Sequence, residues 1–165
     1  MIWKVILFAF VFSVLQLTWQ ASTNLEISRS FIEKAVVAPA AFAVNLLTPD
    51  AHATAVGSHL RSPSGGINII NGCDGMEILF LLIAGFVAAP LNCRARLYGI
   101  LAGIPLVHVL NQARILALFY SARSNPPLFD ALHGFITPIV LVLAIAAYFY
   151  MWLFRSQLPS VAASS

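Results

Sequence analysis

Three reactive side chains of this sequence, Cys73, Arg114 and His133, could together form a catalytic site for acyl transfer. A thiolate is a nucleophile, a nearby guanidinium lowers the pKa of a thiol, and an imidazole transfers protons near neutral pH. Cys73 stands in the stretch NIINGCDGMEILFLLIAGF, residues 68–86, where a polar turn precedes a strongly apolar run. The chemistry requires a fold that brings three distant positions to one place.

The composition predicts that this fold is embedded in a membrane. Of the 165 residues, 60% are hydrophobic and 9% are charged, which lies far outside the range of soluble globular domains. Nine basic and six acidic residues give a net charge of +3, too sparse a set for a nucleic-acid surface. Because the basic residues are so sparse, we predict no nucleic-acid partner. The sequence also has no Cys/His spacing of the zinc type, and we predict no cofactor.

Four apolar segments are suited to cross the bilayer, which takes roughly 20 helical residues. We therefore predict an all-α integral membrane protein with about four transmembrane helices. Between the first two we expect an amphipathic helix at the interface, interrupted near Pro39, and then a small extracytoplasmic loop or β-hairpin. The four segments run over residues 2–18, 76–91, 97–120 and 135–154.

The expected organisation is a single membrane domain over residues 1–165. An alternative for the first segment is a cleaved signal peptide, but Lys4 near its start and its long apolar run favour a retained anchor. The predicted parts are a first transmembrane helix (1–21), the amphipathic helix and extracytoplasmic loop (22–72), a three-helix catalytic core (73–155) and a flexible cytoplasmic tail (156–165).

The basic residues predict the orientation of these helices. The short loop NCRAR, with Arg94 and Arg96, is expected on the cytoplasmic side, together with both chain ends. Arg29, Lys34 and Arg61 oppose this rule, although they lie in a longer segment where the rule is weaker. The protein is thus expected to be a multi-pass protein of the cell (cytoplasmic or inner) membrane.

This topology places the three reactive residues at one leaflet boundary. Cys73 precedes the second span, Arg114 lies about 25 Å along the third span from its cytoplasmic start, and His133 opens the fourth. Three separate crossings therefore deliver them to the extracytoplasmic side, where we expect the active site.

Cys73 is expected to be a free thiol. About 30 Å of helix separates it from Cys93, whereas a disulfide needs Cα atoms within about 7 Å. A helix N-terminus and the nearby Arg114 would lower the pKa of its thiol, while Asp74 and Glu77 would oppose that effect. The alternative is that Cys73 is a small apolar filler at a turn. Asp74 is expected to be a helix N-cap, and Glu77 either pairs with Arg114 or reaches lipid headgroups.

A polar stripe on the third span, His108, Asn111 and Arg114, recurs every three residues. Polar groups inside a membrane normally face a protein interior, because lipid exposure costs several kcal/mol. We expect Asn111 to orient its neighbours or bridge helices and His108 to pack between helices. For Arg114 the alternative is snorkelling toward headgroups.

His133 could act as a general acid and base. Asp130 precedes it by about one helical turn and could fix the tautomer of its imidazole. The alternative is that His133 is an interfacial residue after a capping Asp130.

Three short motifs in this order resemble those of the exosortase/archaeosortase family of membrane transpeptidases. They are NGCDG at 71–75, NQAR at 111–114 and LHG at 132–134, and the resemblance covers about residues 68–150. It is strongest to the short exosortase H type, since most members are longer, with about eight spans. The resemblance implies that Cys73 is the nucleophile, Arg114 the catalytic arginine and His133 the third catalytic residue.

The same resemblance implies a function. The protein would cleave the C-terminal sorting signal of exported proteins through a thioester and transfer them to an acceptor. Its partners would be substrates that carry a short motif, one transmembrane helix and a basic cluster, together with the lipid bilayer and, in an oligomer, further copies of the chain. Two alternatives stay open: a peptidase that only hydrolyses, and a non-catalytic membrane subunit or transporter component. The apolar inner halves of the second and fourth spans disfavour a transport pathway.

Overall fold

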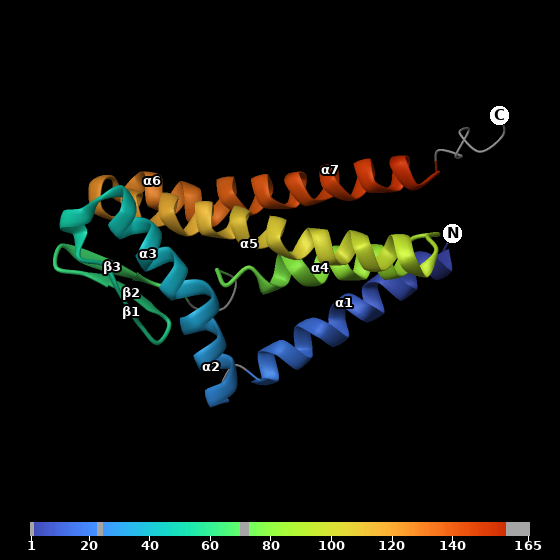
Figure 1. Cartoon of the computed structure of the whole chain (residues 1–165), viewed down its shortest axis with the longest axis horizontal. Helices are drawn as coiled ribbons and strands as arrows, with labels where there is room; N and C mark the ends of the chain where they lie inside the picture. The colour runs from blue at the N-terminus through green and yellow to red at the C-terminus, as the bar shows by residue number, and fades with distance from the viewer. Residues whose placement is uncertain (1, 23–24, 70–72, 158–165) are drawn as a thin grey trace.

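The computed structural model describes residues 2–22, 25–69 and 73–157. Helices α4 (Met76–Ala88), α5 (Cys93–Ser124) and α7 (Thr137–Gln157) run side by side, and α1 (Ile2–Ser22) leans along α4 (Figure 1). The start of α1, the α4–α5 connection and the end of α7 lie at one end of the molecule, opposite the β-sheet (Figure 1). This arrangement agrees with a topology that keeps both chain ends on one side.

The prediction of an all-α membrane protein with about four transmembrane helices is confirmed, although the four long apolar helices differ from those expected. By length and composition they are Ile2–Ser22, Glu26–Leu47, Cys93–Ser124 and Pro126–Ser156. The expected second span is the 13-residue helix α4, which rises about 20 Å and is shorter than a bilayer core. The segment expected at the interface is long enough to cross, and it runs across the direction of α5 (Figure 1).

The helix predicted to be interrupted near Pro39 is continuous. It consists of α2 (Glu26–Ile32), a π-helical segment (Glu33–Val37) and α3 (Ala38–Leu47). Pro39 lies inside this helix, at the second residue after the π-helical segment, an irregular turn of the kind found where a helix takes up a proline. The expected interruption was therefore wrong, and the irregularity lies just before the proline, in the π-helical segment.

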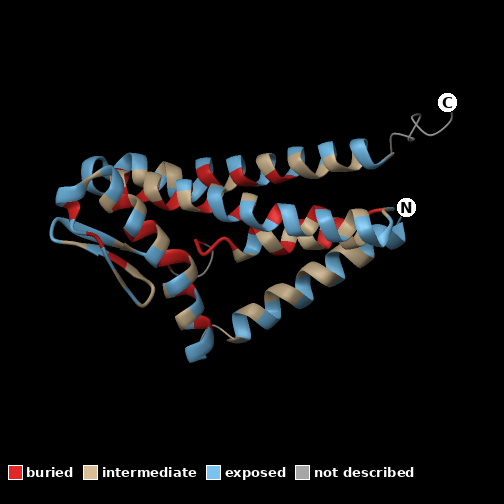
Figure 2. Cartoon of the chain, in the orientation of Figure 1, coloured by how far each residue is buried: buried red, intermediate tan, exposed pale blue. Residues whose placement is uncertain are grey.

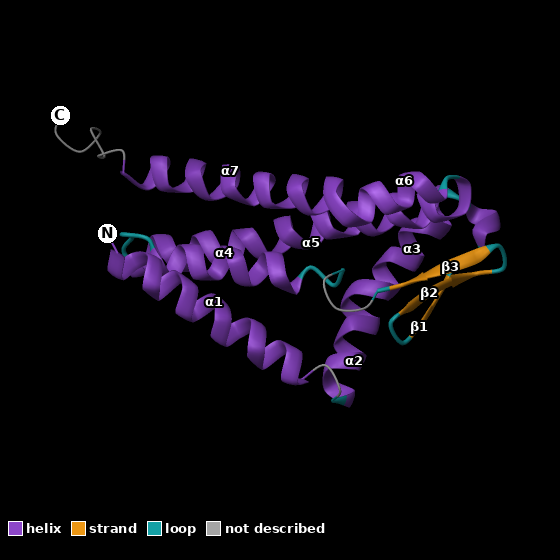
Figure 3. Cartoon of the chain, turned by 180° about the vertical axis from the view of Figure 1, so that it is seen from behind, coloured by secondary structure: helices purple, strands orange, loops and turns teal. Residues whose placement is uncertain are grey.

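The segment expected as a loop or hairpin contains a three-stranded antiparallel sheet in the order β1-β2-β3 (Figure 3). Its strands are β1 (Thr54–Val56), β2 (His59–Ser62) and β3 (Gly65–Asn68). Two-residue turns join them, and such short turns favour hairpins. A short 3-10 turn, Pro49–Ala51, links α3 to the sheet.

The last helical region joins three pieces: α6 (Pro126–Ala131), a π-helical segment η3 (Leu132–Ile136) and α7. The side chain of Asn125 accepts a hydrogen bond from the Leu128 N–H, which defines the start of α6. The predicted flexible tail from residue 156 begins inside α7, and its remainder, 158–165, lies outside the described residues.

Buried side chains form two clusters (Figure 2). The first joins α2–α3, the sheet and the later part of α5, and it includes Val44, Leu60 and Phe119. The second joins α4, the earlier part of α5 and α7 around Phe86. Cys73 belongs to the first cluster and lies three residues before the start of α4, which contributes to the second. Helix α1 has no fully buried residue; one side packs on α4, and the apolar residues of its exposed face are left for lipid or another protein.

Candidate active site

A tight turn before α4 holds Cys73. Gly75 has φ +82°, a left-handed conformation that costs other residues about 1–2 kcal/mol. A Cβ at Gly75 would also lie 2.8 Å from the Asn111 side chain. The Asp74 carboxylate accepts a hydrogen bond from the Met76 N–H at 3.1 Å. The N-cap residue is Gly75 rather than the expected Asp74, although Asp74 still satisfies the first helical N–H.

The turn is also tied to α1. The indole N–H of Trp19 donates to the second carboxylate oxygen of Asp74 at 2.8 Å. The buried Asp74 is thus bonded on both oxygens. This contact connects α1 to the turn that holds Cys73, and removing α1 would leave Asp74 without the indole. In the sequence, only its position at the end of an apolar run distinguishes Trp19.

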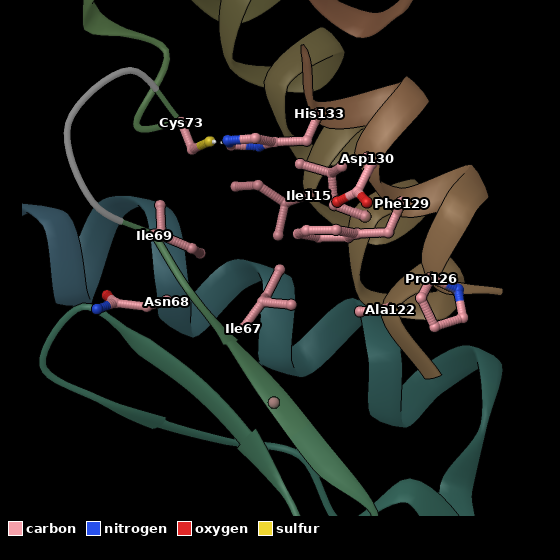
Figure 4. Close-up of a pocket in the computed structure, with 12 residues that line it drawn as sticks. Ile67, Asn68, Ile69, Cys73, Ile115, Ala122, Pro126, Phe129, Asp130 and His133 are labelled. Atoms are coloured by element: carbon pink, nitrogen blue, oxygen red, sulfur yellow. Dashed lines mark hydrogen bonds between the residues drawn. The ribbon is translucent and has the colours of Figure 1, made fainter. Parts of the chain in front are cut away.

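The three reactive side chains meet at one point. Sγ of Cys73 lies 3.6 Å from Nδ1 of His133 and 3.6 Å from Nη2 of Arg114. Arg114 is buried within α5, and one turn earlier Asn111 donates from Nδ2 to the Cys73 carbonyl at 3.2 Å. Figure 4 shows the His133 ring pointing at the Cys73 sulfur. Thiol, guanidinium and imidazole therefore stand within reach of one reacting group.

His133 is positioned by an aromatic side chain rather than by a carboxylate. Its ring stacks on Phe129, with centroids 5.6 Å apart and planes 3° from parallel. Asp130, expected to fix its tautomer, is exposed at the cavity wall, and within the described residues it makes no hydrogen bond to His133. That expectation was wrong. The helix in this region places Phe129, four residues before His133, against the imidazole ring instead of Asp130.

Two cavities open on the thiol. The first, of about 390 Å³, extends from Cys73 and His133 to β3 and α6. The second, of about 300 Å³, has Cys73, His133, Arg114 and Glu77 in its wall. Cys73 is only 6% exposed, yet a reactant can approach it from either side.

The family of the chain follows from a comparison of its whole sequence. A family model described as transmembrane exosortase matches residues 1–158. The chain belongs to the transmembrane exosortase family. The match confirms the family that the three motifs resembled, and it extends their range to include α1, α2–α3 and the sheet. Neither the curated proteins nor the solved structures contain a significant match to the chain.

In this exosortase chain, burial raises the pKa of the Cys73 thiol above its ordinary value. The Arg114 guanidinium lowers this pKa by a smaller amount, and the Asp74 carboxylate raises it. Arg114 and Asp74 shift this pKa in the directions expected from the sequence, but burial is the largest cause and makes the net shift upward. The resting thiol keeps its proton at neutral pH, and a base at the distance of His133 becomes important for forming the nucleophile.

Glu77, His108 and Cys93 are the remaining polar residues that the sequence of this exosortase singled out. Glu77 is exposed in the wall of the second cavity that also contains Arg114. His108 is exposed on α5 and does not pack between helices as expected. Cys93 is an exposed free thiol at the start of α5, and Cys73 is also free, which agrees with the predicted absence of a disulfide. Within the described residues, no group of three or more His, Cys, Asp or Glu could hold a metal.

Proposed function

We propose that this exosortase is a membrane cysteine transpeptidase that cleaves the C-terminal sorting signal of exported proteins. The observation that carries the proposal is the 3.6 Å approach of both His133 Nδ1 and Arg114 Nη2 to the Cys73 sulfur. The three groups come from a turn, a long helix and a π-helical segment. Acyl transfer uses such a set of groups: a nucleophile, a group that carries its proton and a donor that stabilises the oxyanion.

Acylation begins when Cys73 gives its proton to His133 and its sulfur attacks the carbonyl carbon of the scissile peptide bond. The carbonyl oxygen becomes an oxyanion, which the Arg114 guanidinium stabilises. The intermediate then collapses: the C–N bond breaks, and the leaving amine takes the proton from His133. The exported protein is left as a thioester on Cys73.

Deacylation reverses the proton transfers. An acceptor amine, hydroxyl or water gives a proton to His133 and attacks the thioester carbonyl, again forming an oxyanion near Arg114. The C–S bond breaks, and the proton returns from His133 to the Cys73 sulfur. An amine or hydroxyl acceptor gives transfer, and water gives hydrolysis.

An apolar groove beside the site supports a substrate that carries a transmembrane helix. The groove, of about 480 Å³, lies between α1, α4 and α7 and includes Phe8, Gly85 and Ile145. It shares Leu81 and Val142 with the second cavity, so it continues from the thiol. In the proposed arrangement the substrate helix occupies this groove and the motif before it reaches Cys73 on the extracytoplasmic side.

A nucleophilic trap tests the proposal. Membranes that contain the protein and a candidate substrate with a motif–helix–basic tail are treated with hydroxylamine, which attacks thioesters. We expect the processed substrate to end in a hydroxamate at the new C-terminus, detected by mass spectrometry. Without hydroxylamine, the mass of that C-terminus distinguishes transfer from hydrolysis. Processing that gives no hydroxamate at any hydroxylamine concentration would contradict the thioester. If no tailed substrate is processed at all, the non-catalytic subunit becomes the better interpretation.

Replacing Arg114 by Gln should lower the processing rate by roughly 10²–10³-fold, because an oxyanion donor is lost. The midpoint for alkylation of Cys73 should also move to higher pH, since Arg114 lowers the pKa of the thiol. Single-turnover processing and iodoacetamide labelling measure the two effects. Arg123→Gln is the matched control on the same helix: Arg123 is exposed and lies 5.3 Å from the Phe119 ring. Equal rates for the two variants would remove Arg114 from the mechanism.

A further inference from the structure

One edge of the β-sheet forms a wall of the cavity at Cys73. Four consecutive residues of β3 and its end, Gly66, Ile67, Asn68 and Ile69, all contribute to that wall, and the last three are labelled in Figure 4. Successive side chains of a strand point to opposite faces of the sheet. A cavity bordered by four consecutive residues therefore meets the edge of β3 and its backbone, rather than one face.

The register shows which backbone groups this edge offers. The Ile69 N–H donates to the Ser58 carbonyl at 2.8 Å, and Ile67 is paired with Leu60 on β2. Residues of an antiparallel strand alternate between bonding the neighbour and pointing away from it. The N–H and C=O of Gly66 and Asn68 therefore point to the free edge. Among the described residues no hydrogen-bond partner occupies them.

The opposite wall leaves room for a ligand against this edge. It is formed by α5 and α6, and it is mostly apolar, with Ile115, Leu118 and Phe129. The cavity of about 390 Å³ falls within the usual range for ligand sites, roughly 300–1,000 Å³. Gly66 is required by the sheet itself. A Cβ at this position would collide with the Leu60 carbonyl oxygen of β2.

The direction of β3 matches the direction in which a substrate peptide would run toward the Cys73 thiol. The strand runs from Gly65 toward Ile69, at the end of the cavity near Cys73 (Figure 4). A substrate that reaches Cys73 before entering the apolar groove with its C-terminal helix runs the same way. Its residues before the scissile bond would therefore lie parallel to β3.

We propose that the segment of substrate immediately N-terminal to the scissile bond binds as an added parallel strand on the free edge of β3. Gly66 and Asn68 supply two N–H donors and two C=O acceptors to the substrate main chain, as in other cases of strand addition. Substrate side chains that point toward α5 and α6 meet Ile115 and Phe129, which makes this apolar wall the source of sequence preference. The inference rests on the proposed function, because it uses Cys73 as the acylated residue.

Backbone-modified peptides test the strand directly. The reagent is acetyl-trialanine chloromethyl ketone, from which the Cys73 sulfur displaces chloride to form a thioether. Two analogues carry an N-methyl group on the second or the third alanine from the ketone. Since alternate N–H groups face β3, methylation at only one position should slow labelling of Cys73 in the full-length protein, by roughly five- to tenfold. The other analogue should react within about twofold of the parent.

Variants of Asn68 provide the complementary experiment. Asn68→Pro removes the edge N–H, whereas Asn68→Ala keeps it, and both lose the hydrogen bond from Ser58 at 2.9 Å. Proline is tolerated on an edge strand where the N–H bonds no neighbour. We expect the trialanine reagent to label Asn68→Pro roughly five- to tenfold more slowly than Asn68→Ala. Iodoacetamide, too small to use the edge, should label Cys73 equally in both and so report an intact site.

The outcomes separate this inference from the proposed function. Equal effects of the two N-methyl positions, or equal labelling of Asn68→Pro and Asn68→Ala, would overturn strand addition. If iodoacetamide labels Cys73 of Asn68→Pro at a changed rate, the site is disturbed in that variant, and the two N-methyl analogues alone decide whether the substrate binds as an added strand. The proposed function fails separately, when tailed substrates are processed without a thioester at Cys73.

Discussion

Replacing Cys73 by Ala will abolish substrate processing, with a loss on the order of 10⁴-fold or more, as expected for a catalytic nucleophile. The sulfur is the atom that both His133 and Arg114 approach at 3.6 Å, and the alanine leaves neither with a group to activate or stabilise. The measurement is the fraction of a co-expressed tailed substrate that loses its C-terminal helix. Cys73→Ser, which keeps a weaker nucleophile, should retain at most a small residual rate.

Cys93→Ala is the matched control for this experiment. Cys93 is exposed at the first residue of α5, and Arg114 lies 21 residues later in the same helix. A rise of 1.5 Å per residue puts these two positions about 30 Å apart. We expect Cys93→Ala to process substrate at the wild-type rate. Processing that persists in Cys73→Ala would overturn the enzymatic proposal as a whole, including strand addition of the substrate on β3.

Replacing His133 by Ala should lower the processing rate by roughly 10²–10⁴-fold at neutral pH. Burial raises the pKa of the Cys73 thiol, so without the imidazole the sulfur stays protonated and the leaving amine receives no proton. As the pH rises through the thiol pKa, the thiolate forms without a base. The deficit relative to wild type should therefore shrink at alkaline pH, although the missing acid keeps it from closing. Processing rates of the purified protein across neutral and alkaline pH measure this.

His108→Ala serves as the control, because His108 is exposed on α5 and lines neither cavity at the thiol. Its pH profile should coincide with that of wild type. Phe129→Ala adds a further comparison, since it removes the ring on which His133 stacks but keeps the imidazole. Its rate should fall between those of wild type and His133→Ala. A constant deficit of His133→Ala at every pH would exclude His133 as the base for Cys73.

Much of the architecture is local and could be predicted from the sequence. The apolar runs determine where α1, α5 and α7 form. In a membrane such runs favour a helix, because a helix pairs its backbone N–H and C=O groups within the segment. The polar residues were informative because they are so few. Once the number and order of the helices were assumed, Cys73, Arg114 and His133 had to approach the same end of three segments, and the structure brings them together.

Features that depend on how distant segments pack could not be predicted in this way. The π-helical segment with His133 and the Phe129 stack depend on packing around the helix, to which an apolar pattern is insensitive. The hydrogen bond from Trp19 to Asp74 joins residues 55 positions apart. The expected interfacial helix follows its amphipathic pattern, yet its position across α5 is set by its contact with the sheet and α5.

The sequence by itself determined the membrane setting, the main helices and the three side chains capable of chemistry, since hydrophobicity and residue type are properties of each position. Only the tertiary structure decided the sign of the pKa shift at Cys73 and the exposure of the β3 edge beside it. Solvation of a thiol and the free side of a strand depend on which atoms surround them. Those atoms come from elements far away in the chain, so the residues next to Cys73 or β3 in the sequence do not predict them.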